Sequence, residues 1–205
     1  MTRIILVRHG QTQWNVGSGA GERFRGRVDL PLDDTGLAQA HALAERLADL
    51  PIAAVYSSPL KRAVETARPT AQQIGLLIQL LPGIIDIDYG DWQGLSPGEV
   101  ARVYPDLYQL WLEKPHRVRF PNGESLRRVR LRGMATLKEV AVRHEGWTVL
   151  LVAHQVVNKV LVCAMLGLDN SHFWRIRQDN GCINVFEHHH GIFTAVLVND
   201  TCHLM

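Results

Sequence analysis

Short runs of β-branched and other apolar residues alternate with segments of helical periodicity along most of the chain. Buried strands are predicted at residues 4–7, 53–56, 76–81 and 148–153. Helices are predicted at residues 35–50, from residue 57 onward, and at 96–104, 106–114, 124–144 and 156–166. This alternation is typical of an α/β fold, here a three-layer α/β/α sandwich with a mainly parallel sheet between its helices.

Capping and helix-breaking residues set the expected boundaries of these elements. Asp34 and Thr35 offer an N-cap for the first helix, and Pro51 ends it. Pro59 is expected in the first turn of the second helix. Residues 17–26 are rich in glycine and predict a loop. The last two apolar runs, 182–187 and 193–199, predict a C-terminal β-hairpin across residues 188–191, which would give the sheet an antiparallel edge.

Composition excludes several classes of protein. No linker, repeat or low-complexity tract interrupts the 205 residues, so a single domain, 1–205, is expected. A formal net charge of +2 argues against a nucleic-acid partner. No apolar stretch approaches the roughly 20 residues that a membrane span needs, and the N-terminus lacks a signal-peptide pattern. Three widely spaced cysteines without a CxxC pair fit a reducing compartment. We therefore expect a cytoplasmic protein without membrane or nucleic-acid partners.

Polar residues follow the predicted strands at three places. Arg8, His9 and Gly10 come directly after the first strand, Arg62 lies about one turn into the helix after the second, and His154 ends the strand at 148–153. Ligands bind beyond the carboxyl ends of parallel strands, so these residues are expected to meet there. A guanidinium binds two phosphate oxygens at once, and a neutral imidazole beside it can attack phosphorus. His154 could donate a hydrogen bond to a phosphoryl oxygen.

An acidic loop supplies the fourth candidate group. Residues 86–92 contain Asp86, Asp88 and Asp91 among Ile, Tyr, Gly and Trp. A carboxyl group here could protonate a leaving oxygen and later activate water. Taken alone, such a loop is more often a solvated turn; its joint occurrence with the three strand ends favours a catalytic role.

Four stretches in this order, LVRHGQTQWN, SSPLKRAVETA, DIDYGDWQG and VLLVAH, resemble the histidine phosphatase superfamily, which includes the cofactor-dependent phosphoglycerate mutases. The resemblance extends from residue 3 to about residue 200. It implies an α/β/α sandwich that needs no metal and no cofactor, and a phosphohistidine intermediate on His9. By motif position, Arg8, Arg62 and His154 would form the phosphate pocket, and Asn15 would support it.

The chain departs from the family pattern at three positions. Asp86 stands where the proton donor is usually Glu, and because Asp is one methylene shorter, Asp88 remains an alternative donor. Gln155 replaces the usual Gly after His154 and can narrow the pocket. Arg25 stands where Gln is frequent, so Arg23 and Arg25 either bind a second charged group of the substrate or are solvated.

The insertion after the acidic loop is short, which favours hydrolysis of a small phosphomonoester over a mutase reaction. The stretches WLEKPHRVRFPNGESL and NDTCHL are similar to metal-independent phosphoserine phosphatases and α-ribazole phosphatases. A cofactor-dependent phosphoglycerate mutase and a non-catalytic phosphate-binding module remain the alternatives. The C-terminal tail either brings His203 to the substrate or only completes the edge of the sheet.

Three further features are a run of histidines, three tryptophans and an apolar segment near the C-terminus. His188, His189 and His190 are adjacent in a predicted turn and lack a fourth ligand, so no metal site is expected. Trp92, Trp111 and Trp174 either wall the pocket or pack in the core. The C-terminal edge and the apolar segment 156–168 are compatible with a homodimer, although a buried helix gives the same pattern.

Overall fold

A six-stranded sheet organises the computed structural model, which describes residues 1–15 and 21–205. The strands are β1 (Thr2–Arg8), β2 (Ile52–Ser57), β3 (Ile78–Leu80), β4 (Thr148–Ala153), β5 (Ile183–His189) and β6 (Ile192–Asp200). Their order is β3-β2-β4-β1-β5-β6. The first four in this order are parallel to one another, whereas β5 pairs antiparallel with β1 and with β6. The predicted antiparallel C-terminal hairpin is confirmed.

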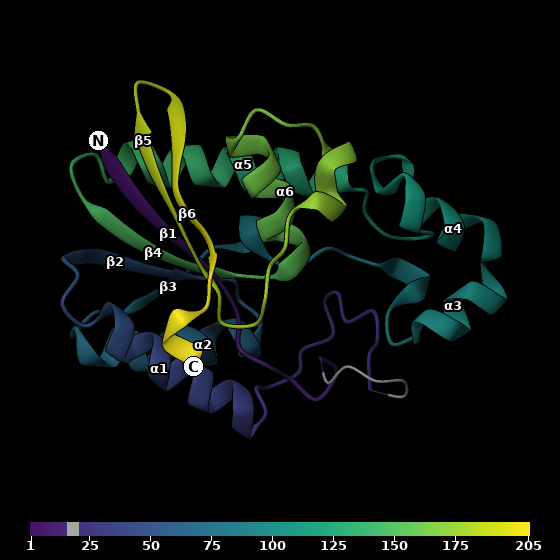
Figure 1. The fold of residues 1–205 in the computed structure, drawn as a ribbon, viewed down its shortest axis with the longest axis horizontal. Helices are drawn as coiled ribbons and strands as arrows, with labels where there is room; N and C mark the ends of the chain where they lie inside the picture. Colours follow the sequence, from purple (N-terminus) through teal and green to yellow (C-terminus); the bar gives the residue numbers. More distant parts are fainter. Residues whose placement is uncertain (16–20) are drawn as a thin grey trace.

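Helices cover both faces of this sheet. They are α1 (Asp34–Leu47), α2 (Lys61–Gln73), α3 (Pro97–Val103), α4 (Pro105–Glu113), α5 (Leu126–Arg143) and α6 (Gln155–Met165). Short 3₁₀ turns are η1 (Pro82–Ile84), η2 (Gly90–Trp92), η3 (Pro115–Arg117), η4 (Asn170–Arg175) and η5 (Cys202–Leu204). Figure 1 shows α1 and α2 on one face, α5 and α6 on the other, and α3 with α4 set apart from these layers. The predicted three-layer α/β/α sandwich is confirmed, and the expectation of one domain, 1–205, stays a prediction.

Alternation along β1 joins the two apolar layers. Ile4 and Leu6 belong to the core beneath α5 and α6, while Ile5 and Val7 belong to the core beneath α1 and α2. All four side chains are at most 1% exposed. Because successive strand residues point to opposite faces, a strand buried on both faces must be apolar throughout, as this one is. No helix within residues 1–15 and 21–205 is long and apolar enough to cross a bilayer.

Two predicted helix starts are wrong, each for a local reason. The N-cap of α1 is Asp33, whose carboxylate accepts a hydrogen bond from Gly36 N–H at 2.8 Å. Asp34 instead lies in the first turn, where its negative charge interacts favourably with the positive end of the helix dipole. Pro59 precedes α2, because Ser58 N–H still donates to Val152 O at 3.0 Å and so continues the sheet pairing.

Other boundaries differ by a few residues. The third strand is shorter than predicted, since only Ile78–Leu80 pairs with β2. The hairpin turn is limited to His190 and Gly191, whose φ angles of 46° and 80° suit a two-residue turn. Of the predicted glycine-rich loop, residues 17–20 lie outside the described residues.

Two glycines let the segment after β1 lie directly on the start of α1. A Cβ atom at Gly36 would stand 2.1 Å from Gln11 O, and one at Gly10 would stand 2.6 Å from Gly36 O. Neither distance is compatible with a side chain, because both neighbours are backbone atoms. The path of the chain immediately after His9 therefore depends on this contact between two glycines.

Replacing Gly36 by Ala is expected to lower the free energy of unfolding by about 1–3 kcal/mol, the usual cost of overpacking. Urea denaturation measures it. Gly98→Ala is the matched control, because Gly98 is helical and exposed, and a Cβ added there would meet no atom within 4 Å. That variant should be neutral or up to about 1 kcal/mol more stable. Equal stability of Gly36→Ala and wild type would contradict the described contact.

Candidate active site

The carboxyl ends of three neighbouring strands bring the predicted groups together. At the end of β1, Arg8 lies opposite Ala153 of β4, and His9 N–H donates to Ala153 O at 3.0 Å. The residue that follows Ala153, His154, is the N-cap of α6. On the other side of β4, the end of β2 leads through Ser58 into α2 and Arg62. The sheet order thus places residues that are far apart in sequence at one edge.

His9 presents one free ring nitrogen. Its Nδ1–H donates to Gly10 O at 2.6 Å, which fixes the neutral tautomer with the lone pair on Nε2. The side chain is fully buried, and Nε2 has no hydrogen-bond partner. Burial lowers the pKa of His9 well below its usual value, and the positive charge of Arg62 lowers it further. His9 is therefore neutral at physiological pH, with its nucleophilic nitrogen unoccupied.

His154 lies beside His9, with their ring centroids 5.3 Å apart. Its Nε2 is 2.7 Å from Ser58 Oγ, whereas its Nδ1 has no hydrogen-bond partner and lies 3.7 Å from Asp86 Oδ2. The pKa of His154 is also lowered well below its usual value, first by burial and then by Arg62. The two imidazoles are therefore both neutral and face one polar space.

Three guanidinium groups surround these rings. Arg62 donates to Val28 O, to Gly26 O and, at 3.0 Å, to the carboxylate of Asp86. Arg8 donates to Gln178 O at 2.6 Å, and Arg25 donates to Trp14 O at 2.9 Å. Burial lowers the pKa of each guanidinium, although a guanidinium stays charged at physiological pH. Three cations thus share one buried carboxylate.

Unpaired buried polar atoms gather in this cluster. Among the described residues, eleven buried side-chain nitrogen and oxygen atoms have no hydrogen-bond partner. Five of them belong here: Arg8 Nε, His9 Nε2, Arg25 Nε, Arg62 Nε and His154 Nδ1. An unpaired buried polar group costs about 1–3 kcal/mol, so a concentration of them indicates a place for a ligand. Cationic donors in excess of carboxylates favour an anion.

The acidic loop presents its two candidate carboxyl groups differently. Asp86 is 4% exposed and lines the cavity described below. Asp88 accepts a hydrogen bond from Gly90 N–H and forms an ion pair with Arg27 at 3.4 Å. Asp88 is not among the residues that line the cavity. The structure brings only Asp86 into contact with the histidine and arginine cluster.

A cavity of about 430 Å³ opens onto this cluster. Its polar lining consists of Arg8, Asn15, Glu22, Arg23, Arg25, Gly26, Asp86, Gln155 and Asn180. Its other lining residues are Phe24, Tyr89, Pro97, Tyr108, Trp111, Leu112, Val156, Phe173 and Trp174. The cavity therefore has a cationic part beside Arg8 and an aromatic part formed by α4 and η4. His9 and His154 are fully buried and do not contribute to the lining.

Besides Arg8, three predicted substrate-binding residues lie in this lining, whereas Arg62 is fully buried and does not. Asn15 Oδ1 accepts hydrogen bonds from Thr12 N–H and Thr12 Oγ–H, so it also holds the loop after His9 in place. Arg23 donates to Gly94 O and lies 3.5 Å from a carboxylate oxygen of Glu99. Gln155 is the first residue of α6.

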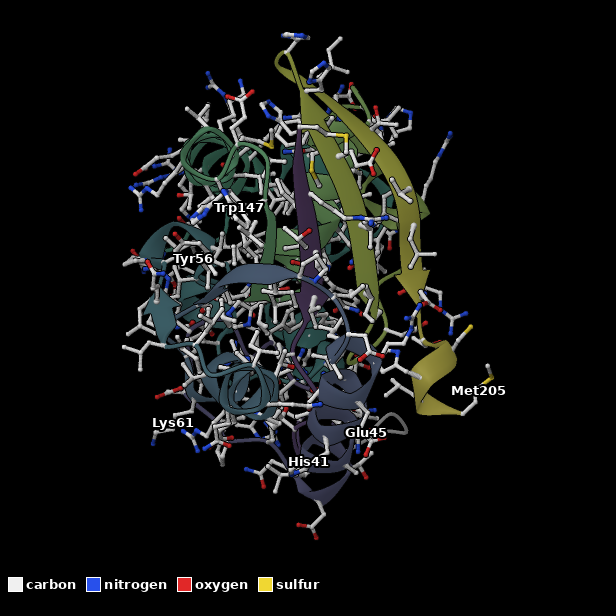
Figure 2. All side chains as sticks on the ribbon, turned by 90° about the vertical axis from the view of Figure 1, so that its left-hand side faces the viewer. His41, Glu45, Tyr56, Lys61, Trp147 and Met205 are labelled. Carbon is white, nitrogen blue, oxygen red and sulfur yellow. The ribbon has the colours of Figure 1, made fainter. Side chains whose placement is uncertain are left out.

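His203 lies elsewhere. It belongs to η5, which contacts α1, and it is not among the residues that line the cavity. Figure 2 shows the C-terminal residue Met205 on the same side as Glu45 of α1. The expected tail, residues 199–204, begins within the sheet: Asn199 and Asp200 are the last residues of the edge strand β6, and Asp200 pairs with Ile183. The structure thus follows the sheet-edge expectation for the first two residues of the tail, and His203 packs on α1 instead of at the cavity.

Sequence reasoning missed several residues of the site. Ser58, Asn180 and Phe173 had not been singled out, although Ser58 lies within a quoted motif. Asn180 and Phe173 come from connections around η4 and β5, where no periodicity marks a functional residue. Trp111 and Trp174 line the cavity, whereas Trp92 is fully buried in the core.

The three histidines at the hairpin point in different directions. His188 and His189 are successive residues of β5 and so point to opposite faces, and His190 occupies the turn. Within the part of the chain that the structure describes, no group of three His, Cys, Asp or Glu side chains is placed to hold a metal ion.

Comparison with known proteins gives one consistent result. Residues 4–201 match the histidine phosphatase superfamily (branch 1). Phosphoserine phosphatase 1 of Hydrogenobacter thermophilus is 39% identical over 205 residues, which cover 100% of this chain and 95% of that protein. The solved structure of Bacillus stearothermophilus YhfR has a TM-score of 0.94 and 30% identity, with both chains covered completely. The alpha-ribazole phosphatase of Shigella flexneri has a TM-score of 0.86 and 26% identity over 97% of this chain and 96% of that one.

The lowered pKa values of the two buried histidines predict a pH dependence of stability. Below about pH 6.5 the unfolded chain binds protons that the folded chain excludes, so the free energy of unfolding falls as pH falls. Each histidine contributes up to about 1.4 kcal/mol per pH unit. His9→Gln should reduce this slope between about pH 6 and pH 5, as measured by urea denaturation. The matched control is His41→Gln, because His41 is exposed on α1 and lies outside the site. An unchanged slope in His9→Gln would contradict burial of a neutral His9.

Proposed function

The chain belongs to branch 1 of the histidine phosphatase superfamily and is a phosphoric monoester hydrolase, and on this basis we propose that His9 carries the phosphoryl group. The reaction would run without a metal or another cofactor. Its substrate is a small-molecule phosphomonoester. The single observation that carries the proposal is the set of five unpaired buried atoms that consists of His9 Nε2 and four neighbouring nitrogens.

Binding follows from charge and from these unpaired atoms. The phosphate dianion would enter the space between Arg8, Arg62 and Arg25, and each guanidinium still has a free Nε–H to donate. We place the proton of neutral His154 on Nδ1, with the Ser58 hydroxyl donating to Nε2. His154 Nδ1–H then becomes a fourth donor to the phosphoryl oxygens. Such preorganised donors stabilise the charge that develops during transfer.

In the first step the lone pair on His9 Nε2 forms a bond to phosphorus, and the bond from phosphorus to the ester oxygen breaks. In the free site Asp86 is a carboxylate paired with Arg62, and in this proposal it takes up a proton from solvent when the phosphate dianion binds beside it. The leaving oxygen then takes this proton from Asp86, so the product leaves as an alcohol. His9 then carries a positive charge shared with Nδ1–H. The hydrogen bond from Nδ1–H to Gly10 O stabilises this charge and keeps the ring oriented.

In the second step a water molecule attacks the phosphohistidine. Asp86, now a carboxylate, accepts a proton from this water, and the electrons of the N–P bond return to His9 Nε2. Inorganic phosphate leaves, and Asp86 returns its proton to solvent. The net reaction consumes one phosphomonoester and one water and yields one alcohol and one phosphate.

Phosphoserine is the first substrate that we propose. Its support is the relative named phosphoserine phosphatase 1, which aligns with the whole of this chain at 39% identity. Arg23 at the cavity wall is a candidate partner for the second anionic group, the carboxylate of phosphoserine, although it already has Glu99 as a neighbour.

The cavity supports a second candidate, α-ribazole 5′-phosphate. Its volume of about 430 Å³ exceeds what phosphoserine needs, and Trp111, Phe173 and Trp174 offer aromatic surfaces to a planar ring. A cofactor-dependent phosphoglycerate mutase would instead transfer phosphate within a phosphoglycerate and need a bisphosphate primer. A non-catalytic module would bind phosphorylated ligands without turnover.

The homodimer and the cytoplasmic location stay predictions. The apolar segment that suggested a dimer is explained by packing within the chain, because α6 is almost wholly buried and contacts α5 and η4. The remaining support for a homodimer is β6, which lies at one edge of the sheet and exposes Ile192, Val196 and Val198.

The function is tested by phosphate release in excess chelator from phosphoserine, α-ribazole 5′-phosphate, 3-phosphoglycerate, sugar phosphates and nucleotides. Turnover is expected, strongest on one of the first two compounds. His9→Ala should lose about 10³-fold or more of kcat/KM because the covalent route disappears. His41→Ala is the control, since His41 is exposed on α1 (Figure 2). Full activity of His9→Ala would contradict the mechanism, and primer-dependent isomerisation would indicate the mutase.

The proton donor is tested by the leaving group. Asp86→Asn keeps the shape of the side chain but cannot transfer a proton. The value of kcat/KM reports only the steps through departure of the leaving group, so kcat/KM for an alkyl ester such as phosphoserine should fall by about 10²-fold or more. The loss should be much smaller for 4-nitrophenyl phosphate, whose leaving group needs no protonation. Asp88→Asn should change both rates by less than about threefold, because Asp88 is paired with Arg27 outside the cavity. A larger, leaving-group-dependent loss in Asp88→Asn would reverse the assignment.

A further inference from the structure

Lys159 is a buried cation behind the aromatic part of the cavity. It lies on α6 and is 7% exposed. Its Nζ is 4.9 Å from the ring centroid of Phe173 and 4.7 Å from that of Trp174. None of the ion pairs among the described residues includes Lys159, so no carboxylate of those residues lies within ion-pair distance of it. The ammonium therefore has two aromatic faces as its main partners.

Both of these aromatic residues line the cavity. Phe173 and Trp174 pack edge to face with centroids 4.8 Å apart, and Trp174 packs on Trp111 at 5.1 Å. Trp174 Nε1–H donates to Trp111 O at 2.9 Å, which ties η4 to α4. Lys159 itself does not line the cavity; it lies one helical turn after Gln155, which does. It can act on a ligand only through the rings.

Stability alone does not explain a lysine at this place. Burying an ammonium without a carboxylate partner is unfavourable, and an apolar side chain of similar length would avoid that cost. Attraction between an ammonium and an aromatic face offsets part of the cost and fixes where the rings lie. A charged group that orders two residues of a cavity wall suggests a role in shaping that wall.

We propose that Lys159 is a positioning residue that sets substrate selectivity by holding Phe173 and Trp174 in place as the wall facing the leaving group. The proposal rests on the proposed function, in which this cavity binds the phosphomonoester. Substrates whose leaving group reaches the aromatic wall depend on Lys159. Substrates with a short leaving group, which stay in the cationic part of the cavity, do not.

The surroundings of Lys159 give the wall a pH dependence. Burial lowers the pKa of Lys159 to about 8, and the positive charge of Arg8 from β1 adds to this lowering. Cys163 of the same helix and Asp179 from the connection before β5 act in the opposite direction. The ammonium is thus present at neutral pH and is lost as pH rises above about 8, which would release the two rings.

The test compares 1-naphthyl phosphate, which reaches the wall, with glycerol phosphate, which does not. In Lys159→Met, KM for 1-naphthyl phosphate should rise about fivefold or more, with kcat and the KM for glycerol phosphate within about twofold of wild type. Lys159→Arg should restore KM, because a guanidinium also binds aromatic faces. The melting temperature of Lys159→Met should be equal to or higher than that of wild type. Wild-type KM for 1-naphthyl phosphate should rise between about pH 7 and pH 9, and that of Lys159→Met should not.

Three results would overturn the proposal. Equal rises of KM for both esters would mean that Lys159 acts only through its charge on the anion. A lowered melting temperature with loss of kcat on both esters would mean a structural role. An unchanged KM for 1-naphthyl phosphate in Lys159→Met would mean no role.

A second measurement does not require turnover. In the His9→Ala background, quenching of tryptophan fluorescence gives the Kd of 1-naphthyl phosphate and of inorganic phosphate. Adding Lys159→Met should raise the first Kd about fivefold and leave the second unchanged. If wild type hydrolyses no ester, the proposed function fails, while this binding experiment still decides the role of Lys159. No effect on either Kd would reject that role.

Discussion

The convergence of unpaired buried nitrogen atoms around His9 is the constraint on which the rest of the structure depends. Arginine and histidine nitrogens without partners are costly in the interior of a protein. Here they come from the ends of β1 and β4, from the first turn of α2 and, for Arg25, from the loop before α1. They can meet only because the sheet order puts β4 between β1 and β2. The apolar packing on both faces of β1 holds that order against the cost of the site.

Charge and tautomer together decide what the cluster can do. Arg8, Arg25 and Arg62 outnumber the single buried carboxylate of Asp86, which makes the site selective for an anion. The same burial and positive charge lower the pKa of His9, so the ring that must act as a nucleophile is kept neutral. The hydrogen bond to Gly10 O then directs the lone pair to Nε2. Phosphate binding and activation of the nucleophile have one physical cause.

Much of this arrangement follows from local sequence patterns. Apolar runs and helical periodicity predicted the sandwich. The rule that ligands lie beyond strand ends predicted that Arg8, His9, Arg62 and His154 would meet.

Other features depend on tertiary contacts. The start of α1 was misplaced by one residue because Asp33 and Asp34 are both good caps, and only the distance to Gly36 N–H decides between them. The position of His203 was not predictable, since the packing of a short tail on α1 depends on tertiary contacts. Lys159 was overlooked because a lysine in an apolar helix carries no periodic signal, and its aromatic partners are about 15 residues away in sequence.

The most direct test of covalent catalysis by His9 is to trap the phosphorylated enzyme. Wild type is mixed with substrate, quenched in alkali, in which phosphohistidine survives, and digested for mass spectrometry. We expect the added mass of one phosphoryl group on the peptide that contains His9, localised to ring atom Nε2, and none in His9→Ala. Turnover with no phosphorylated His9, or with the phosphoryl group on another residue such as His154, would contradict this mechanism.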